Sequence, residues 1–181
     1  MDVFEAIRKR HSVRSYLADE VSNEKIEKIL EAARLAPSAG NIQPWHLIVV
    51  FDQQKRNKLS KGRYAKFLAE SPVVLVGCGD KKASPNWHTV DTAIALQNIV
   101  LTATSEGLAT CWIGSFKENQ VKKLLSIPER FRVIALLAVG YHREKLELSS
   151  KVLHFFRRKK KLQKIVSIEK FGNAYSIKKK S

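Results

Sequence analysis

Five consecutive residues near the N-terminus carry side chains that could bind a phosphate. Arg10, His11, Ser12 and Arg14 surround Val13, so two guanidinium groups, an imidazole and a hydroxyl group fall within one short stretch. In an extended conformation these groups can turn towards one phosphate dianion, and arginine offers forked donors that match phosphate oxygens. A short basic run after a helix is also typical of a solvated surface that complements the helix dipole. The stretch alone leaves both interpretations open.

The common signatures of nucleotide-binding and hydrolytic enzymes are absent. Gly77 and Gly79 form the start of a dinucleotide-binding fingerprint, but Lys82 stands where its third glycine is required. The sequence has no Gly-Lys pair followed by Ser or Thr, and no Gly-x-Ser-x-Gly motif. These absences argue against a Rossmann, P-loop or serine-hydrolase enzyme.

Cysteine and histidine are too scattered for a metal site. Cys78 and Cys111 are the only cysteines, neither has metal-ligand spacing around it, and the five histidines form no i,i+4 pair. We therefore expect two buried free thiols and no metal.

Two predicted helices frame the basic stretch and a later loop. Asp2 can cap a helix that runs to about Arg10, and Ser22 can cap a second helix that Pro37 stops. A loop rich in Pro, Ser, Gly and Asn follows over residues 36–44. The first helix carries an apolar face made of Val3, Phe4 and Ile7.

Strands and helices alternate along the rest of the chain. We expect strands over residues 45–51, 73–79, 110–113 and 132–141. The helices between them are expected over residues 53–70, 88–106 and 117–125. This pattern predicts an α+β fold with a largely buried mixed sheet. The helix over residues 88–106 is apolar on more than one face, so we expect a second subunit to cover part of it.

Length and charge indicate one domain with a basic extension. The 181 residues, 44% of them apolar, suffice for one core. The formal charge of +16 is uneven, because residues 151–181 hold 11 Lys or Arg against one Glu. We divide the chain into a domain over residues 1–150 and an extension over residues 151–181 that docks on the same domain or on a partner subunit. The basic tail, interleaved with phenylalanine, leaves a nucleic-acid-binding protein as an alternative.

Two further motifs support a cofactor site. Residues 36–45 read Ala-Pro-Ser-Ala-Gly-Asn-Ile-Gln-Pro-Trp, and residues 107–114 read Gly-Leu-Ala-Thr-Cys-Trp-Ile-Gly. In their order and spacing over about residues 3–141, these motifs and the basic stretch resemble the nitroreductase family of flavoproteins. The resemblance implies a central mixed, mainly antiparallel sheet flanked by helices, with a long buried helix at a dimer interface.

The resemblance also implies a homodimer with FMN sites shared across the interface. It assigns the phosphate and ribityl end of the cofactor to Arg10, His11, Ser12 and Arg14. It places the backbone N–H groups of Ile113 and Gly114 near the flavin ring. The ring and the ribityl tail would also be lined by four residues of the partner subunit: Pro37, Ser38, Ala39 and Asn41. A close backbone approach at the ring suits glycine.

The chain departs from the family at its basic end. Members commonly carry an Arg-Lys-Pro-Leu type strip there, whereas residues 157–162 read Arg-Arg-Lys-Lys-Lys-Leu without proline. We expect Arg158 and Lys160 to supply a further phosphate contact, although the sequence leaves open which basic residue is used. Arg63 or Lys66 is a candidate near the flavin pyrimidine, where a cation would stabilise anionic reduced flavin.

The implied function is that of an FMN-dependent oxidoreductase. It would pass electrons from NADH or NADPH to a nitroaromatic, quinone or similar conjugated acceptor in alternating half-reactions, without a catalytic side chain. A non-catalytic flavin-binding protein is a second alternative. Residues 1–11 lack the apolar segment of a secretory signal and no apolar stretch is long enough to cross a bilayer, so we expect a cytoplasmic protein without a membrane partner.

Overall fold

The computed structural model describes residues 1–62, 64–144 and 159–175. The chain divides into two compact units, Met1–Glu144 and Lys145–Ser181. The expected boundary between residues 150 and 151 lies outside the described residues. The described part of the second unit holds a short turn, η3 (Leu162–Lys164), and an isolated antiparallel bridge between Ser167 and Ala174.

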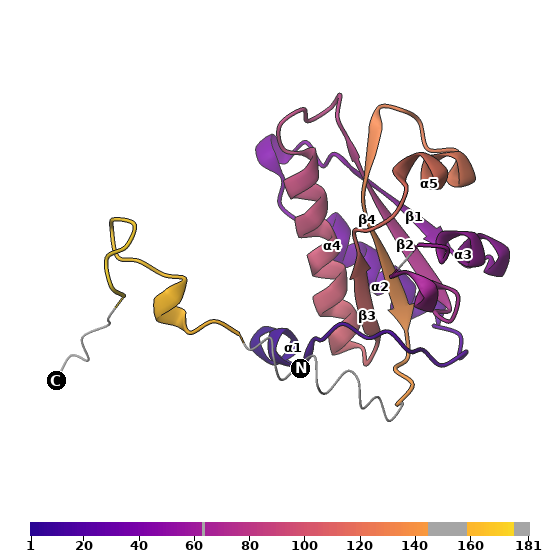
Figure 1. Cartoon of the computed structure of the whole chain (residues 1–181), viewed down its shortest axis with the longest axis horizontal. Helices are drawn as coiled ribbons and strands as arrows, with labels where there is room; N and C mark the ends of the chain where they lie inside the picture. The colour runs from indigo at the N-terminus through magenta and orange to yellow at the C-terminus, as the bar shows by residue number, and fades with distance from the viewer. Residues whose placement is uncertain (63, 145–158, 176–181) are drawn as a thin grey trace. The chain divides into compact units, whose positions relative to one another are not determined.

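A four-stranded sheet forms the centre of the first unit (Figure 1). Its order is β1-β2-β4-β3, and each neighbouring pair is antiparallel. The parallel component in the described residues is an isolated bridge between Ser12 and Thr110 of β3. The α+β fold expected from the sequence is confirmed. The strands are β1 (Trp45–Val50), β2 (Val73–Asp80), β3 (Ala109–Ile113) and β4 (Phe131–Gly140).

Both faces of the sheet are buried, which explains why β2 reads as a continuous apolar run. Successive side chains of a strand point to opposite faces. Val74 and Val76 therefore enter one apolar core, whereas Val73 and Leu75 enter the other. The result is a layered unit with a core on each side of the sheet.

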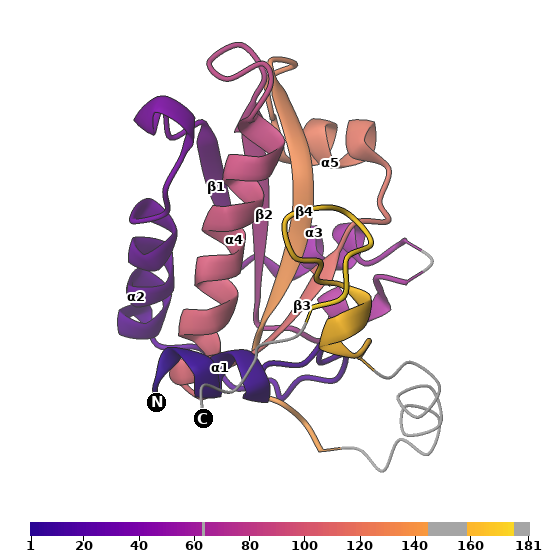
Figure 2. The same ribbon diagram turned by 90° about the vertical axis from the view of Figure 1, so that its left-hand side faces the viewer.

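Helices cover the two faces of the sheet in pairs (Figures 1 and 2). Residues of α2 and α4 build one core with the sheet, and residues of α3 and α5 build the other. None of the described helices is both long and apolar enough to span a bilayer. The bounds are α2 (Asn23–Arg34), α3 (Gln53–Leu59), α4 (His88–Ser105) and α5 (Glu118–Leu125).

The first two helices begin at the caps that the sequence predicts. In α1 (Val3–Lys9), the Asp2 carboxylate accepts a hydrogen bond of 2.8 Å from the backbone N–H of Glu5. The Ser22 hydroxyl accepts from the N–H of Lys25 at the start of α2. Each bond satisfies one of the backbone donors that a helix N-terminus leaves free.

The single helix expected over residues 53–70 is wrong. Helix α3 ends at Leu59, and only a short turn, η2 (Lys66–Leu68), follows. The buried Arg56 explains the break, because its guanidinium donates to the carbonyl oxygens of Phe51, Ala69 and Ser71. These bonds hold the chain where it folds back, which a continuous helix would prevent.

Apolar side chains on α1 and α4 remain exposed in the single chain. Phe4 is 68% exposed and Val3 is 71% exposed on α1, while Val90 is 47% and Ile94 is 36% exposed on α4. Figure 2 shows α1 crossing the end of α4. A second subunit over this face stays a prediction, and the exposed apolar surface is the feature that motivates it.

We expect Gly140→Ala to lower the free energy of unfolding by about 1–3 kcal/mol, the usual cost of overpacking. A Cβ at Gly140 would lie 2.5 Å from Cδ of Pro72 and 3.1 Å from Cδ1 of Tyr16. Gly114→Ala is the control, because a Cβ there meets no protein atom within 4 Å. Urea denaturation of both variants measures the difference. Equal midpoints would contradict the close packing of β4 against Pro72.

Candidate functional site

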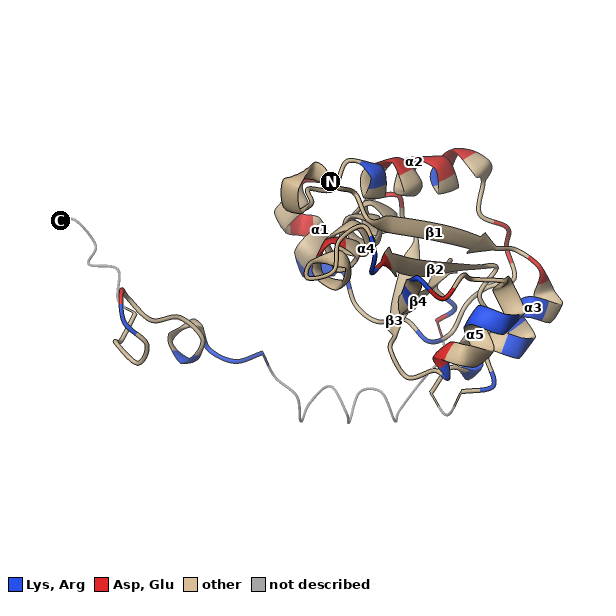
Figure 3. Cartoon of the chain, turned by 90° about the horizontal axis from the view of Figure 1, so that it is seen from above, with Lys and Arg blue, Asp and Glu red and all other residues tan. Residues whose placement is uncertain are grey.

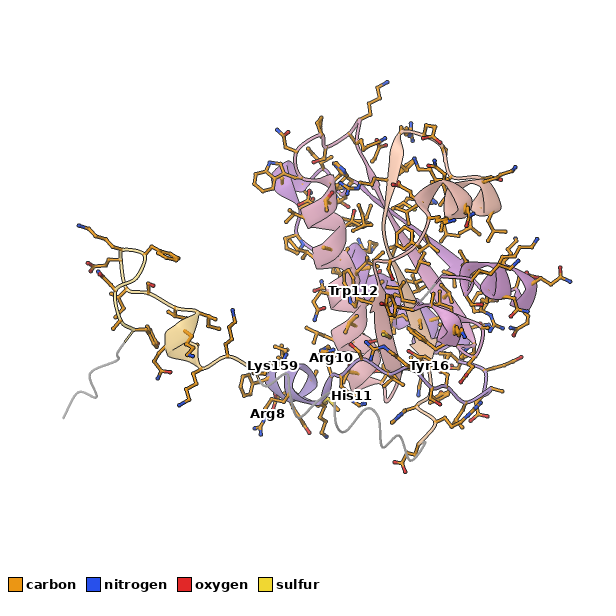
Figure 4. The ribbon with its side chains drawn as sticks, in the orientation of Figure 1. Arg8, Arg10, His11, Tyr16, Trp112 and Lys159 are labelled. Atoms are coloured by element: carbon orange, nitrogen blue, oxygen red, sulfur yellow. The ribbon has the colours of Figure 1, made fainter. Side chains whose placement is uncertain are left out.

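The basic stretch over residues 10–14, here called the phosphate strip, lies along the edge of the sheet (Figure 4). Helix α1 ends at Lys9, and the following Arg10, with a φ of −57° and a ψ of 124°, starts an extended segment. Ser12 forms a parallel bridge with Thr110 of β3, and the N–H of Val13 donates to the carbonyl of Thr110 at 3.0 Å. The main chain of the phosphate strip is therefore fixed to β3.

Side chains alternate along the phosphate strip. Val13 is buried in the core and its carbonyl accepts a 2.8 Å hydrogen bond from the hydroxyl of the fully buried Tyr16. Because an extended chain has a period of two, Arg10, Ser12 and Arg14 lie on the side opposite Val13. Two guanidinium groups and a hydroxyl group are thus available on one side of the phosphate strip.

The arginines of the phosphate strip have no carboxylate partner. Within residues 1–62, 64–144 and 159–175, neither Arg10 nor Arg14 takes part in an ion pair. The exposed His11 contacts its own chain, since its ring meets that of His142 edge-on at 5.7 Å and its Nδ1 lies 3.1 Å from the carbonyl oxygen of Lys9. The open cations suit an anionic ligand.

A buried thiol lies beneath the phosphate strip. Burial raises the pKa of Cys111, while the charge of Arg14, a hydrogen bond with Ser12 and the charge of Arg10 act in the opposite direction. Burial also raises the pKa of Cys78, to about 11. Both cysteines are free and buried, as the sequence predicts. Protonated thiols at neutral pH are poor nucleophiles, so these residues pack the core.

The other end of β3 presents an open stretch of backbone. Ile113, the last residue of β3, is 4% exposed, and Gly114 follows it at the surface. Apart from Gly114 and its two chain neighbours, no atom of the described residues lies within 4 Å of the position that a Cβ would occupy at Gly114, so a flat ligand could approach this backbone. From Thr110 to Gly114 the strand advances roughly 13 Å at its usual rise per residue. The phosphate strip and Gly114 therefore lie at the two ends of one strand.

The loop after α2 has an unusual backbone. Gly40, Asn41 and Gln43 all have left-handed φ values, of 57°, 55° and 53°. The Ser38 hydroxyl accepts from the N–H of Gln43 at 2.9 Å, and the Gln43 side chain donates to the carbonyl of Asn41. A glutamine in this conformation is strained, and such strain persists where the surroundings over-determine it, often at binding sites.

Asp91 anchors this loop, and the sequence analysis did not identify it. Its carboxylate is 3% exposed and lies 3.3 and 3.4 Å from the backbone nitrogen of Ala39, which donates to it. Asp91 is the one acidic residue between His88 and Ser105. A single charged residue in so apolar a helix is the signal that could have singled it out.

One chain brings some of the expected site residues together but not all of them. Asp91 holds the loop near the start of α4, whereas Ala103 near its end accepts from the N–H of Leu108, which leads into β3 and the phosphate strip. Asp91 and Ala103 are twelve positions apart in the helix, about 18 Å along its axis. Figure 1 shows the loop and the phosphate strip at opposite ends of α4. The loop and the phosphate strip are therefore not brought together within one chain.

The structure describes two of the four remaining basic residues that the sequence suggests for the cofactor site. Lys66 is exposed on η2, and a Cβ at the nearby Gly62 would lie 3.2 Å from the carbonyl oxygen of Ser115, so this segment passes the end of β3. Lys160 is exposed in the second unit. Arg63 and Arg158 lie outside the described residues.

Comparison with known proteins gives consistent matches. The model of the nitroreductase family matches residues 7–62 and 53–141. A protein of Archaeoglobus fulgidus named "Putative NADH dehydrogenase/NAD(P)H nitroreductase" is 37% identical over 143 residues, which cover 75% of this chain and 82% of that protein.

Two solved structures extend the match to the fold. A nitroreductase family protein from Clostridium difficile 630 has a TM-score of 0.81 at 32% identity, with 94% of this chain and 99% of that chain covered. A structure titled FMN-dependent nitroreductase, from Clostridium difficile R20291, has a TM-score of 0.73 at 31% identity and covers 86% and 97%.

Proposed function

Because the chain belongs to the nitroreductase family, and is thus an NAD(P)H-dependent oxidoreductase, we propose that it uses FMN to reduce a conjugated acceptor such as a nitroaromatic or a quinone. The observation that carries the proposal is the donor set of the phosphate strip. Arg10, Ser12 and Arg14 lie on one side of an extended segment, and neither guanidinium has an ion-pair partner in the described residues. Such a set fits a phosphate dianion.

The rest of the site fits a flavin as well. The backbone of Gly114 is open on the side where a Cβ would stand, so its N–H group and that of the preceding Ile113 would meet the edge of a flat ring. Lys66 or Arg63 would stabilise negative charge on the pyrimidine end of that ring, and Arg158 and Lys160 of the basic extension would add a phosphate contact. His11 would complete the ribityl end of the site.

A homodimer would supply the missing wall of the site. Pro37, Ser38, Ala39 and Asn41 of the partner subunit would line the ring and the ribityl tail. The position of the loop at the far end of α4, where Asp91 holds Ala39, supports this arrangement. Exposed apolar residues on α1 and α4 would form the dimer contact, since burial of such surface drives association.

FMN, when bound, supplies the transfer of two electrons from NADH or NADPH to the acceptor. The residues of this chain bind and orient the participants. The phosphate strip would hold the anionic end, Gly114 would leave room for the ring, and the loop over residues 36–44 of the partner subunit would line the ring. We place the domain at residues 1–150 with the extension at residues 151–181. The free Cys78 and Cys111 support a reducing, cytoplasmic location.

The test uses the purified full chain. We expect it to carry a yellow chromophore that is released on denaturation and identified as FMN by chromatography. Under anaerobic conditions NADH or NADPH should bleach this colour, and a nitroaromatic or quinone should restore it. A colourless protein that also fails to take up added FMN would overturn the proposal. A yellow protein that neither dinucleotide bleaches would instead be a non-catalytic flavin-binding protein.

A further inference from the structure

A groove lies on the face of the sheet that α3 and α5 cover, and the site described above does not use it. It lies between α3, the segment that follows α3, and α5, with Ser115 at its end. Its volume of about 860 Å³ falls within the range of small-molecule sites, roughly 300–1,000 Å³. The groove is large enough for a nucleotide-sized ligand.

The walls of the groove are positively charged. Among the described residues, four lysines line it and no Asp or Glu does: Lys58, Lys61, Lys117 and Lys123. All four lysines are exposed, and none takes part in an ion pair within the part of the chain that the structure describes. Figure 3 shows blue segments on both α3 and α5. Cations gathered along a concave wall raise the local concentration of an anionic ligand.

The acidic residues around α5 do not neutralise these lysines. Glu118 and Glu129 instead form ion pairs with Lys122, at 3.7 and 2.9 Å. Lys122 does not line the groove and is only 6% exposed. Glu118 also accepts from the backbone N–H of Val133 at 3.0 Å. These two carboxylates therefore neutralise the buried Lys122, and the lysines that line the groove remain unpaired within the described residues.

The floor of the groove is apolar. Leu59 and Val121 are buried, Phe116 and Leu124 are half-buried, and all four line the groove. A simple inorganic anion would leave this floor in contact with water. A ligand that combines phosphate groups with a flat, weakly polar ring would cover the floor and meet the lysines at once.

The groove begins beside the proposed flavin site. Ser115 lines it and directly follows Gly114, and a Cβ at Gly62, on the opposite wall, would lie 3.2 Å from the Ser115 carbonyl oxygen. A substrate whose reactive ring reached the open backbone at Gly114 could extend its remaining part into the groove.

We propose that this lysine groove binds the adenosine half of NADH or NADPH, with its phosphate groups on the lysines and adenine on the apolar floor. The proposal rests on the proposed function, which makes NADH or NADPH a substrate. The chain lacks a dinucleotide-binding fingerprint, since Lys82 replaces the third glycine. Recognition of the dinucleotide by lysines rather than by a helix N-terminus accounts for that absence. We expect NADPH to bind more tightly than NADH, because its extra phosphate adds a charge that the lysines can contact.

The experiment compares Lys117→Gln/Lys123→Gln with Lys81→Gln/Lys82→Gln in the FMN-supplied full chain. Both pairs remove two charges from exposed lysines, but Lys81 and Lys82 do not line the groove. Isothermal titration calorimetry measures the Kd of 2′,5′-ADP, a fragment that lacks nicotinamide, and steady-state assays measure KM for NADPH and for the acceptor. We expect the groove variant to raise the Kd and the KM for NADPH about tenfold, as two exposed charge pairs allow, while kcat and the KM for the acceptor stay unchanged.

The outcomes separate the two proposals. If the unaltered chain oxidises NADPH and both variants bind 2′,5′-ADP equally, the groove proposal is overturned and the proposed function stands. A rise in KM for the acceptor alone would also overturn it, because the groove would then bind the acceptor. If the unaltered chain takes up no FMN and oxidises neither dinucleotide, the proposed function itself fails. A weaker dependence of KM on salt in the groove variant would support the lysine contacts.

Discussion

Replacing Arg10 and Arg14 together by alanine is expected to weaken FMN binding roughly a thousandfold, because each charge-assisted hydrogen bond contributes about 1.5–3 kcal/mol. Both guanidinium groups lie on the open side of the phosphate strip, and neither has a carboxylate that could compensate within the described ranges. Fluorescence titration of the apoprotein with FMN measures the change. Each single variant should lose part of the affinity.

Two controls make this result specific. Riboflavin lacks the phosphate, so its affinity should be the same in the double variant and the unaltered chain. Arg8→Ala removes a nearby exposed arginine of α1 (Figure 4) that lies about 200° around the helix from position 10, and it should leave the FMN affinity unchanged. Equal loss of FMN and riboflavin would mean that the arginines support the fold rather than the phosphate.

A heterodimer that carries a different defect in each subunit is expected to regain about one FMN site, because a two-fold axis places two equivalent sites across one interface. One subunit carries Arg10→Ala/Arg14→Ala. The other carries Ser38→Asp/Asn41→Asp, which adds two carboxylates to the loop. Neither homodimer should retain FMN, whereas the heterodimer, purified through a different tag on each subunit, should hold about half of the normal FMN and activity.

This complementation follows from the distance between the two parts of the site. Asp91 fixes the loop near the start of α4, and the phosphate strip lies beyond the other end of that helix. In the heterodimer one site combines both intact parts and the other combines both defects. An FMN site built within one chain would leave the heterodimer empty, which is the outcome that would contradict a shared site. A tagged heterodimer of unaltered subunits controls for the tags.

Local signals in the sequence predict most of the first unit. Asp2 and Ser22 are N-caps, as expected, and Pro37 follows the end of α2. The continuous apolar run after Pro72 is a strand buried on both faces. These features depend on residues close to one another in the chain, which is why they can be read without the structure.

The error at residues 53–70 has a long-range cause. Charged residues with good helix propensity favour one long helix there, but Arg56 bonds to carbonyl groups before and after the turn. Such tertiary bonds override helix propensity, and a sequence pattern cannot indicate which carbonyl groups will surround one arginine. The same holds for Asp91, whose partner Ala39 is 52 residues away.

The candidate site is predictable to a similar extent. The motifs predict which segments would meet a flavin, and the structure places the phosphate strip and Gly114 along one strand. The separation of the loop from the phosphate strip depends on the length and direction of α4, so it emerges only in three dimensions. The lysine groove has no contiguous motif at all, because α3 and α5 contribute to it from segments nearly 60 residues apart.

The pairing of the phosphate strip with β3 also bears on solubility. β3 is a terminal strand of the sheet, and an unpaired strand edge is a template for aggregation between chains. The bridge at Ser12 and the Val13 N–H cover part of this edge, and they do so with main-chain atoms only. Replacing side chains of the phosphate strip is therefore expected to leave this main-chain protection of the sheet edge in place.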